Sequence, residues 1–158
     1  MYSEKLLHHS IVILLIEDNP GDVRLTKEAF AGSKFIQKIY DVRDGVEAMA
    51  FLKKEPPYEE MPQPDLIFLD LNLPRKNGME VLRELKGDPK LRFIPVLILT
   101  TSSAEKDIFE TYSHHANCYI TKPVTMDEFF EVAEAIEKFW FNIVILPSKF
   151  DGNHLVLT

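Results

Sequence analysis

The chain alternates between short apolar runs and longer segments in which apolar residues return every three or four positions. Three runs, at residues 11–16, 66–69 and 96–99, are wholly apolar, which is typical of strands buried on both faces of a sheet. Residues 35–42 mix apolar and polar positions and predict a half-exposed edge strand. Residues 117–121 predict a short fifth strand.

A helical segment follows each predicted strand. We expect helices from about residue 22 to 31, from residue 44, from about 78 to 87, from about 102 to 115, and from 125 to at least 140. Strand and helix therefore alternate five times with short connections. This order predicts an α/β fold, with a five-stranded parallel sheet covered by helices on both faces.

Length and composition bound the organisation of the chain. Its 158 residues suffice for one domain, which we expect at residues 10–147, between a flexible leader at 1–9 and a short C-terminal tail at 148–158. The net charge of −7 and the scattered basic residues argue against a nucleic-acid partner. A single cysteine, Cys118, fits a reducing compartment. With neither a signal peptide nor a membrane-length apolar stretch, we expect a cytoplasmic protein without a membrane partner.

Chemically useful side chains follow four of the five predicted strands. Glu17 and Asp18 follow the first strand, Asp70 the third, Thr100 the fourth and Lys122 the fifth. The carboxyl ends of parallel strands line one crevice, so these side chains can converge, although Asp70 taken alone could equally cap a loop. Mg²⁺ would relieve the repulsion of crowded carboxylates, and a lysine and a hydroxyl could clamp phosphoryl oxygens. The crevice therefore favours phosphoryl transfer to a carboxylate nucleophile.

These motifs together resemble the receiver domains of two-component response regulators. The resemblance covers roughly residues 10–140 and implies a flavodoxin-like receiver fold with strand order 2-1-3-4-5. The residues that carry it are Ile16-Glu17-Asp18, Leu69-Asp70-Leu71-Asn72-Leu73-Pro74 with Gly78, Leu99-Thr100-Thr101, and Tyr119-Ile120-Thr121-Lys122-Pro123.

The resemblance assigns a phosphoacceptor and a metal site. Asp70 would accept a phosphoryl group from a phosphohistidine of a sensor histidine kinase. Asp18, Asp70 and the backbone carbonyl of Asn72 would bind Mg²⁺ directly. Glu17 stands where an aspartate is more usual in the family, and it would act through a metal-bound water. The only enzymatic activity implied is self-phosphorylation and autodephosphorylation at Asp70.

The resemblance also assigns the residues that respond to phosphorylation. Lys122 would pair with Asp70 at rest and with the phosphoryl group afterwards, and Thr100 would hydrogen-bond a phosphoryl oxygen. Tyr119 would be the aromatic switch, turning inward as Thr100 moves. The Lys122–Pro123 bond would be a cis peptide. The switched surface would be the face made by the fourth helix, the fifth strand and the fifth helix.

Segments 17–22 and 139–147, with Leu25 and Phe30, look like those of single-domain regulators partnered with bacterial phytochromes of the cyanobacterial type. This closer resemblance implies a phytochrome-type kinase as partner and a homodimer. The last helix and the tail support the dimer with an apolar stripe that is wide for a small domain, and Phe141 and Ile145 are expected to lie off this stripe. The alternative is that the tail folds back on its own domain. The expected dimer face comprises Phe139, Trp140, Ile143 and Val144.

Three other functions compete with a phosphorylated receiver. A non-phosphorylated pseudo-receiver would act only as a protein-binding module, but it would have little reason to hold the full set of acidic residues, Thr100 and Lys122. A flavin-binding electron carrier would need a phosphate loop after the first strand, where Glu17 and Asp18 would repel a phosphate. A DNA-binding regulator would need a second domain, which the expected organisation does not include.

Overall fold

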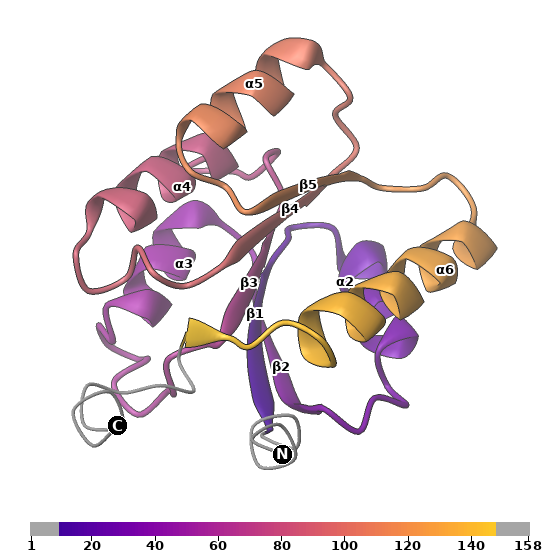
Figure 1. Cartoon of the computed structure of the whole chain (residues 1–158). Coiled ribbons are helices and arrows are strands. Elements are labelled where there is room, and N and C mark those ends of the chain that lie inside the picture. The colour runs from indigo at the N-terminus through magenta and orange to yellow at the C-terminus, as the bar shows by residue number, and fades with distance from the viewer. Residues whose placement is uncertain (1–9, 148–158) are drawn as a thin grey trace.

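The computed structural model describes residues 10–147, and the predicted leader and C-terminal tail lie outside the described residues. The five strands form one parallel sheet in the order β2-β1-β3-β4-β5, as predicted (Figure 1). The half-exposed strand is at the edge, also as predicted. The strands are β1 (Ile11–Ile16), β2 (Ile36–Val42), β3 (Leu66–Leu69), β4 (Val96–Thr100) and β5 (Cys118–Thr121).

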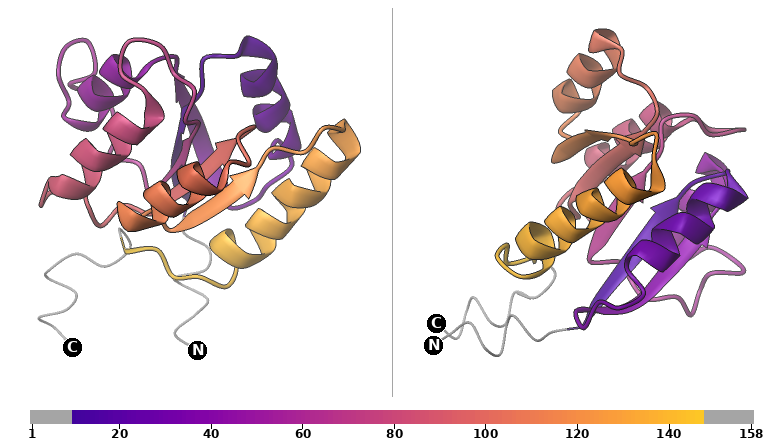
Figure 2. Two further views of the ribbon diagram at one scale, coloured as in Figure 1. Left: turned by 90° about the horizontal axis from the view of Figure 1, so that it is seen from above. Right: turned by 90° about the vertical axis from the view of Figure 1, so that its right-hand side faces the viewer.

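Helices cover both faces of the sheet. Helices α2 (Pro20–Ala29) and α6 (Met126–Ile136) lie side by side on one face, as Figure 2 shows. Helices α3 (Gly45–Leu52), α4 (Gly78–Gly87) and α5 (Glu105–Ser113) lie on the other face (Figure 1). Within residues 10–147 no helix has the length and apolar character that crossing a membrane requires.

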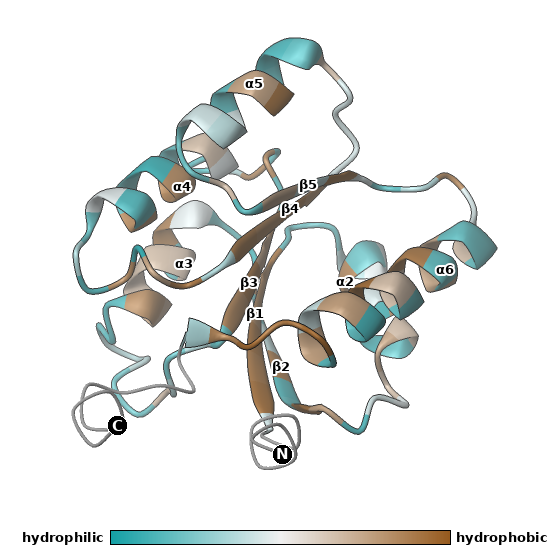
Figure 3. Cartoon of the chain, viewed as in Figure 1, coloured by the Kyte–Doolittle hydropathy of each residue, from teal (hydrophilic) through white to brown (hydrophobic). Residues whose placement is uncertain are grey.

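The sheet divides the core into two apolar clusters, because successive side chains of a strand point to opposite faces. In β1, Leu14 and Ile16 pack toward α3 and α4, whereas Ile13 and Leu15 pack toward α2 and α6. The apolar colour is concentrated on the inner strands and the polar colour on the outer helix surfaces (Figure 3). The doubly buried strands therefore have no polar face, which explains their uninterrupted apolar sequence.

Most helices begin at a side chain that accepts a hydrogen bond from a free backbone N–H of the first turn. Helix α5 differs, because Ala104 precedes it and supplies no side-chain cap. The hydroxyl of Ser102 donates instead to Asp107 (2.6 Å), so the helix begins at Glu105 and not near residue 102 as predicted. The capping residues of the other four helices are Asn19, Asp44, Asn77 and Thr125.

The segment after α6 differs from the predicted continuous helix and its apolar stripe. The α-helix ends at Ile136 and continues as the π-helix η1 (Glu137–Phe141). Phe141 is buried, with its ring centroid 5.7 Å from that of Phe30, and Leu146 is buried in the same cluster. We expected Phe141 to lie off the apolar stripe of the last helix. The shift to π geometry instead turns its ring toward α2.

The four residues of the expected dimer face divide between the core and the surface. Trp140 and Val144 are half-buried against the cluster that contains α2 and α6. Phe139 and Ile143 are exposed, with relative exposures of 52% and 65%. The tail therefore folds back on its own domain in part, and two large apolar side chains remain on the surface.

Lys86, near the end of α4, forms hydrogen bonds at the end of the sheet where strands β4 and β5 begin. Its ammonium donates to the carbonyls of Arg92 and Ile94 (both 2.9 Å) and to Oδ1 of Asn117 (3.2 Å). The same Asn117 oxygen accepts from the backbone N–H of Val96 (2.8 Å). Burial lowers the pKa of Lys86 to about 8. One half-buried cation thus joins the segments that lead into β4 and β5.

Candidate functional site

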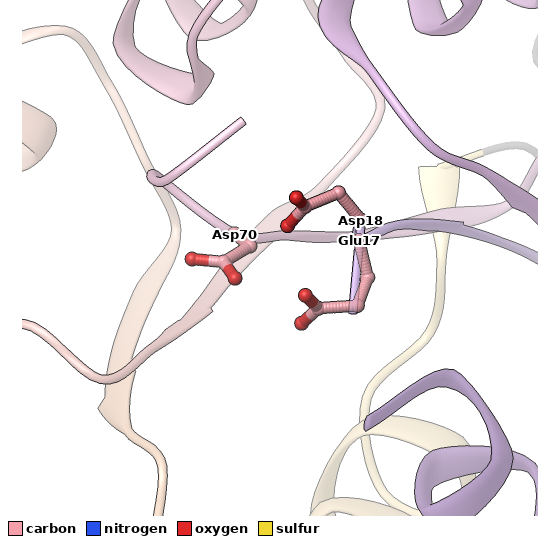
Figure 4. Close-up of side chains that lie close together, drawn as sticks. All are labelled: Glu17, Asp18 and Asp70. Atoms are coloured by element: carbon pink, nitrogen blue, oxygen red, sulfur yellow. The ribbon is translucent and has the colours of Figure 1, made fainter. Parts of the chain in front are cut away.

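Three carboxylates meet just beyond the carboxyl ends of β1 and β3. The backbone N–H of Glu17 donates to the carbonyl of Val42, and that of Asp70 to the carbonyl of Ile16 (both 3.0 Å), so both residues extend the sheet. Glu17 and Asp70 are 2% and 7% exposed, whereas Asp18 is exposed. One carboxylate oxygen from each of the three lies within 4.8 Å of the others, and the side chains point into a common space (Figure 4).

Lys122 supplies a buried positive charge to this cluster. Its side chain is 7% exposed, and its ammonium hydrogen-bonds a carboxylate oxygen of Glu17, Oδ2 of Asp22 (2.9 Å) and Oδ2 of Asp70 (3.2 Å). The backbone N–H of Lys122 donates to the carbonyl of Thr100 (2.7 Å), which fixes the start of the loop after β5. The predicted convergence of strands one, three, four and five on one crevice is therefore present.

Sequence reasoning missed Asp22 as a member of this group. It lies four residues after Asp18, in the first turn of α2, and its backbone N–H donates to Oδ1 of Asn19 (3.1 Å). A first-turn residue of a helix that starts directly after a strand lies close to that strand's end. The short Asn-Pro-Gly connection between Asp18 and Asp22 was the signal that could have placed it there.

Burial and the mutual contacts of Glu17 and Lys122 shift the pKa values of both residues. Burial raises the pKa of Glu17 to about 7, against the hydrogen bond and the charge of Lys122, and the charge of Asp70 adds to the rise. Burial also acts to lower the pKa of Lys122, but hydrogen bonds to Glu17 and Asp22 and the negative charges of Glu17 and Asp70 outweigh it, so the pKa is raised. Lys122 is therefore a permanent cation in contact with three carboxyl groups.

The carboxylate of Asp70 is held on both oxygens. Its Oδ1 accepts from the hydroxyl of Thr100 (2.8 Å) and from the backbone N–H of Asn72 (3.1 Å), and its Oδ2 accepts from Lys122. Thr100 is fully buried. A group attached to Asp70 would therefore have a hydroxyl, an amide N–H and an ammonium within reach.

Tyr119 lies on β5, next to the segment that follows Thr100. Its ring is half-buried against the cluster on the α3 and α4 side, and its hydroxyl donates to the carbonyl of Ser102 (2.9 Å). Its backbone N–H donates to the hydroxyl of Tyr112 on α5 (3.1 Å). Burial raises the pKa of the Tyr119 phenol, so the hydroxyl stays protonated and remains a donor at neutral pH. Tyr119 thus connects the site to α5.

The loop after Asp70 packs tightly because two glycines lack a side chain. A Cβ on Gly78 would lie 2.2 Å from the carbonyl oxygen of Asp70, and one on Gly45 would lie 2.0 Å from that of Lys76. Arg75 adds an ion pair to Asp44 (3.2 Å).

A groove of about 490 Å³ opens beside the site. Its lining residues are Asp18, Leu71, Asn72, Leu73, Pro74, Asn77, Met79, Asp107 and Glu110.

One predicted feature of the site is wrong. Among residues 10–147 the cis peptide bond is Pro56–Pro57, and the Lys122–Pro123 bond is not cis. The trans form of an X–Pro bond is favoured by about 0.5–1 kcal/mol unless the surrounding chain opposes it. With the Lys122–Pro123 bond in the trans form, the Lys122 ammonium contacts its three carboxylate partners.

Comparisons with known proteins agree with this geometry. A family model described as the response regulator receiver domain matches residues 13–134. The chain is 47% identical over 137 residues to the response regulator Rcp1 of Synechocystis sp., a match that covers 87% of this chain and 93% of that protein.

Two crystal structures are similar over 87% of this chain and 99% of each of theirs. One is the phosphorylated cyanobacterial phytochrome response regulator RcpA, at 49% identity and a TM-score of 0.85. The other is the Mn²⁺-bound form of Rcp1, at 47% identity and a TM-score of 0.83. With the sheet order and the crowded acidic site, these matches show that the chain belongs to the response regulator receiver domain family.

Proposed function

We propose that this receiver accepts a phosphoryl group on Asp70 from a phosphohistidine of a sensor histidine kinase. The observation that carries the proposal is the environment of the Asp70 carboxylate. It lies among the acidic cluster, the ammonium of Lys122 and the hydroxyl of Thr100, at the edge of a groove that opens to solvent.

The transfer needs little rearrangement of the described residues. A carboxylate oxygen of Asp70 attacks phosphorus, the bond between phosphorus and the imidazole nitrogen breaks, and that nitrogen leaves with the electron pair. Lys122 and Thr100 then exchange their contacts with Asp70 for contacts with phosphoryl oxygens. The charge that develops on these oxygens is met by donors that are already in place, which lowers the cost of reorganisation.

Receiver domains bind a divalent metal, and the residues of this site fit one. Three carboxylate oxygens within 4.8 Å of each other form a hard, oxygen-only donor set. We propose Mg²⁺, held directly by Asp18, Asp70 and the backbone carbonyl of Asn72, with Glu17 acting through a water. The bound cation would supply positive charge to the phosphoryl oxygens.

We propose that phosphorylation is read out through Thr100 and Tyr119. Thr100 contacts Asp70 directly, and Tyr119 is tied by its hydroxyl to Ser102, two residues after Thr100. A shift of Thr100 toward a phosphoryl oxygen would release space into which the Tyr119 ring could turn. The face formed by α5, β5 and α6 would change as a result.

The similarity to phytochrome response regulators supports a phytochrome-type sensor kinase as the partner. We further propose a homodimer that uses the face containing Phe139, Trp140, Ile143 and Val144, since two of these side chains remain exposed. A cytoplasmic location is supported by Cys118, a free and half-buried thiol that suits a reducing compartment.

Intact mass after incubation with acetyl phosphate and Mg²⁺ tests the proposed acceptor. We expect a gain of about 80 Da, one phosphoryl unit, in the unchanged chain and none in Asp70→Asn or after chelation of the metal. Asp127→Asn removes the same charge from an exposed position on α6 and is the matched control. Phosphoryl uptake that persisted in Asp70→Asn would refute the assignment of Asp70 as the acceptor. No uptake by the folded unchanged chain would favour a pseudo-receiver that only binds proteins.

A further inference from the structure

The three partners of the Lys122 ammonium are not equivalent. Glu17 and Asp70 also belong to the trio of carboxylates whose oxygens lie within 4.8 Å of each other, where a divalent cation fits. Asp22 contacts Lys122 at 2.9 Å but is not a member of that trio. A cation bound by the trio would draw on the negative charge of Glu17 and Asp70 and would repel the nearby ammonium. Asp22 alone among the three would keep its full charge for Lys122.

We propose that Asp22 is a positioning residue, which keeps the Lys122 ammonium beside Asp70 when a divalent metal occupies the acidic cluster. This inference rests on the proposed metal site and on the proposed role of Lys122. The metal and the ammonium must occupy the same small space together if both are to neutralise phosphoryl oxygens. An anion that contacts Lys122 but is not a member of the trio makes that simultaneous occupancy less costly.

The backbone of Asp22 is fixed before any metal arrives. Its N–H donates to Oδ1 of Asn19 (3.1 Å), and its carbonyl accepts from the hydroxyl of Thr26 (2.8 Å), which is 1% exposed. The N–H of Asn19 in turn donates to Oε2 of Glu17 (3.1 Å). The first turn of α2 is thus tied to the acidic cluster by its backbone, and this places Asp22 within hydrogen-bond distance of Lys122.

The side chain of Asp22 is 34% exposed, whereas those of Lys122 and Glu17 are 7% and 3% exposed. The Asp22 carboxylate is therefore partly solvated while it contacts the buried ammonium, and it lies outside the trio that a metal would occupy. A lysine that lost Asp22 would have only carboxylates that the metal also needs. It would then compete with the metal for them, and both the affinity for the metal and the placement of the ammonium would suffer.

A double-mutant cycle on Mn²⁺ binding tests this role. The concentration of free Mn²⁺ is measured by electron paramagnetic resonance during titration of four proteins. These are the unchanged chain, Asp22→Asn, Lys122→Met and the double variant. We expect Asp22→Asn to weaken Mn²⁺ binding about three- to tenfold, the size of one charge-assisted hydrogen bond at a partly exposed site. We expect the same substitution to change the affinity less than twofold when Lys122 is methionine.

Two further variants keep the test independent of Lys122→Met, which could fold poorly. Asp22→Glu retains the carboxylate and should restore at least half of the lost affinity. Glu28→Gln removes the same charge from an exposed position on α2 and should leave the affinity unchanged. Unaltered Mn²⁺ binding in Asp22→Asn would overturn the proposal. An equal loss in both Lys122 backgrounds would also overturn it, because Asp22 would then act on the metal by its charge alone.

The outcome is separable from that of the proposed function. A chain that takes up no phosphoryl group from acetyl phosphate, yet shows the Lys122-dependent effect of Asp22 on Mn²⁺, would refute phosphorylation and leave the positioning role standing. A chain that is phosphorylated at Asp70 but shows no coupling between Asp22 and Lys122 would support the proposed function and refute the positioning role of Asp22.

Discussion

The hydroxyl of Thr100 donates a 2.8 Å hydrogen bond to Oδ1 of Asp70. The two residues lie at the carboxyl ends of the neighbouring strands β4 and β3, and both are buried. This contact is the shortest connection between the proposed acceptor and the segment that carries Ser102 and, through it, Tyr119. Thr100 therefore lies between Asp70 and the segment whose Ser102 carbonyl accepts from Tyr119.

The first prediction concerns the Thr100 hydroxyl. Thr100→Val removes the donor but keeps the branched shape, so we expect phosphoryl uptake from acetyl phosphate to slow about tenfold, the cost of one lost hydrogen bond to a charged group. Thr100→Ser retains the donor and should stay within about threefold of the unchanged chain. The rate of mass gain measures both. Equal rates for the valine and serine variants would show that the hydroxyl contributes nothing to the transfer.

The second prediction concerns the core role of the C-terminal segment. Phe141 is 3% exposed against Phe30, so Phe141→Ala should lower the free energy of unfolding by about 3–5 kcal/mol. Phe139→Ala removes an equally large ring from a position that is 52% exposed, and it should cost less than about 1 kcal/mol. Urea unfolding of both variants makes the comparison. Similar losses would mean that burial of Phe141 does not anchor this segment.

The third prediction concerns the dimer. If Phe139 and Ile143 form its apolar centre, the double substitution Phe139→Ser and Ile143→Ser should shift the protein to monomer in light scattering without lowering its stability. Truncation after residue 138 is a poorer test, because it also removes Phe141 and Leu146 from the core. A dimer that persists in the double variant would place the interface elsewhere or leave it to other residues.

The sequence predicted the sheet well because each inner strand is apolar on both faces, as Leu14 and Leu15 illustrate by packing on opposite sides. The acidic pair, Asp70, Thr100 and Lys122 could be placed because parallel strands end at the same edge. Asp22 escaped notice because its position depends on the angle at which α2 leaves β1. Burial of Phe141 escaped notice because a π-helical turn changes the face on which each later residue lies.

The fourth prediction concerns the glycine that lets the loop after β3 pack against Asp70. A Cβ at Gly78 would lie 2.2 Å from the Asp70 carbonyl oxygen and 2.6 Å from the Cα of Leu71, both backbone atoms. Gly78→Ala must therefore displace the loop, and we expect it to lower the free energy of unfolding by about 2 kcal/mol or more and to slow phosphoryl uptake. Gly32→Ala, with nothing within 4 Å of the new Cβ, is the control and should be neutral. Normal uptake in Gly78→Ala would show that loop placement does not limit the reaction.

The fifth prediction is a pH dependence of stability that comes from Lys86. Burial lowers its pKa from 10.5 to about 8 in the folded protein, whereas in the unfolded chain the pKa returns to its ordinary value. Between pH 8 and 10.5 the unfolded state therefore binds more protons at this site than the folded state, and linkage requires stability to rise with pH in that window. Below pH 8 both states are protonated and the contribution of Lys86 no longer changes.

Tyrosines and other lysines also titrate above pH 8, so the Lys86 contribution must be isolated as a difference. Unfolding free energies of the unchanged chain and of Lys86→Gln, measured in urea from pH 7 to 10.5, should be parallel at first and then separate, with the unchanged chain gaining relative to the variant. Lys90→Gln, at an exposed position of the same region, should show no such separation. A constant difference across the window would contradict the prediction. It would mean that hydrogen bonds to the three acceptors offset the cost of burying the ammonium, so that Lys86 has the same pKa in the folded and unfolded states.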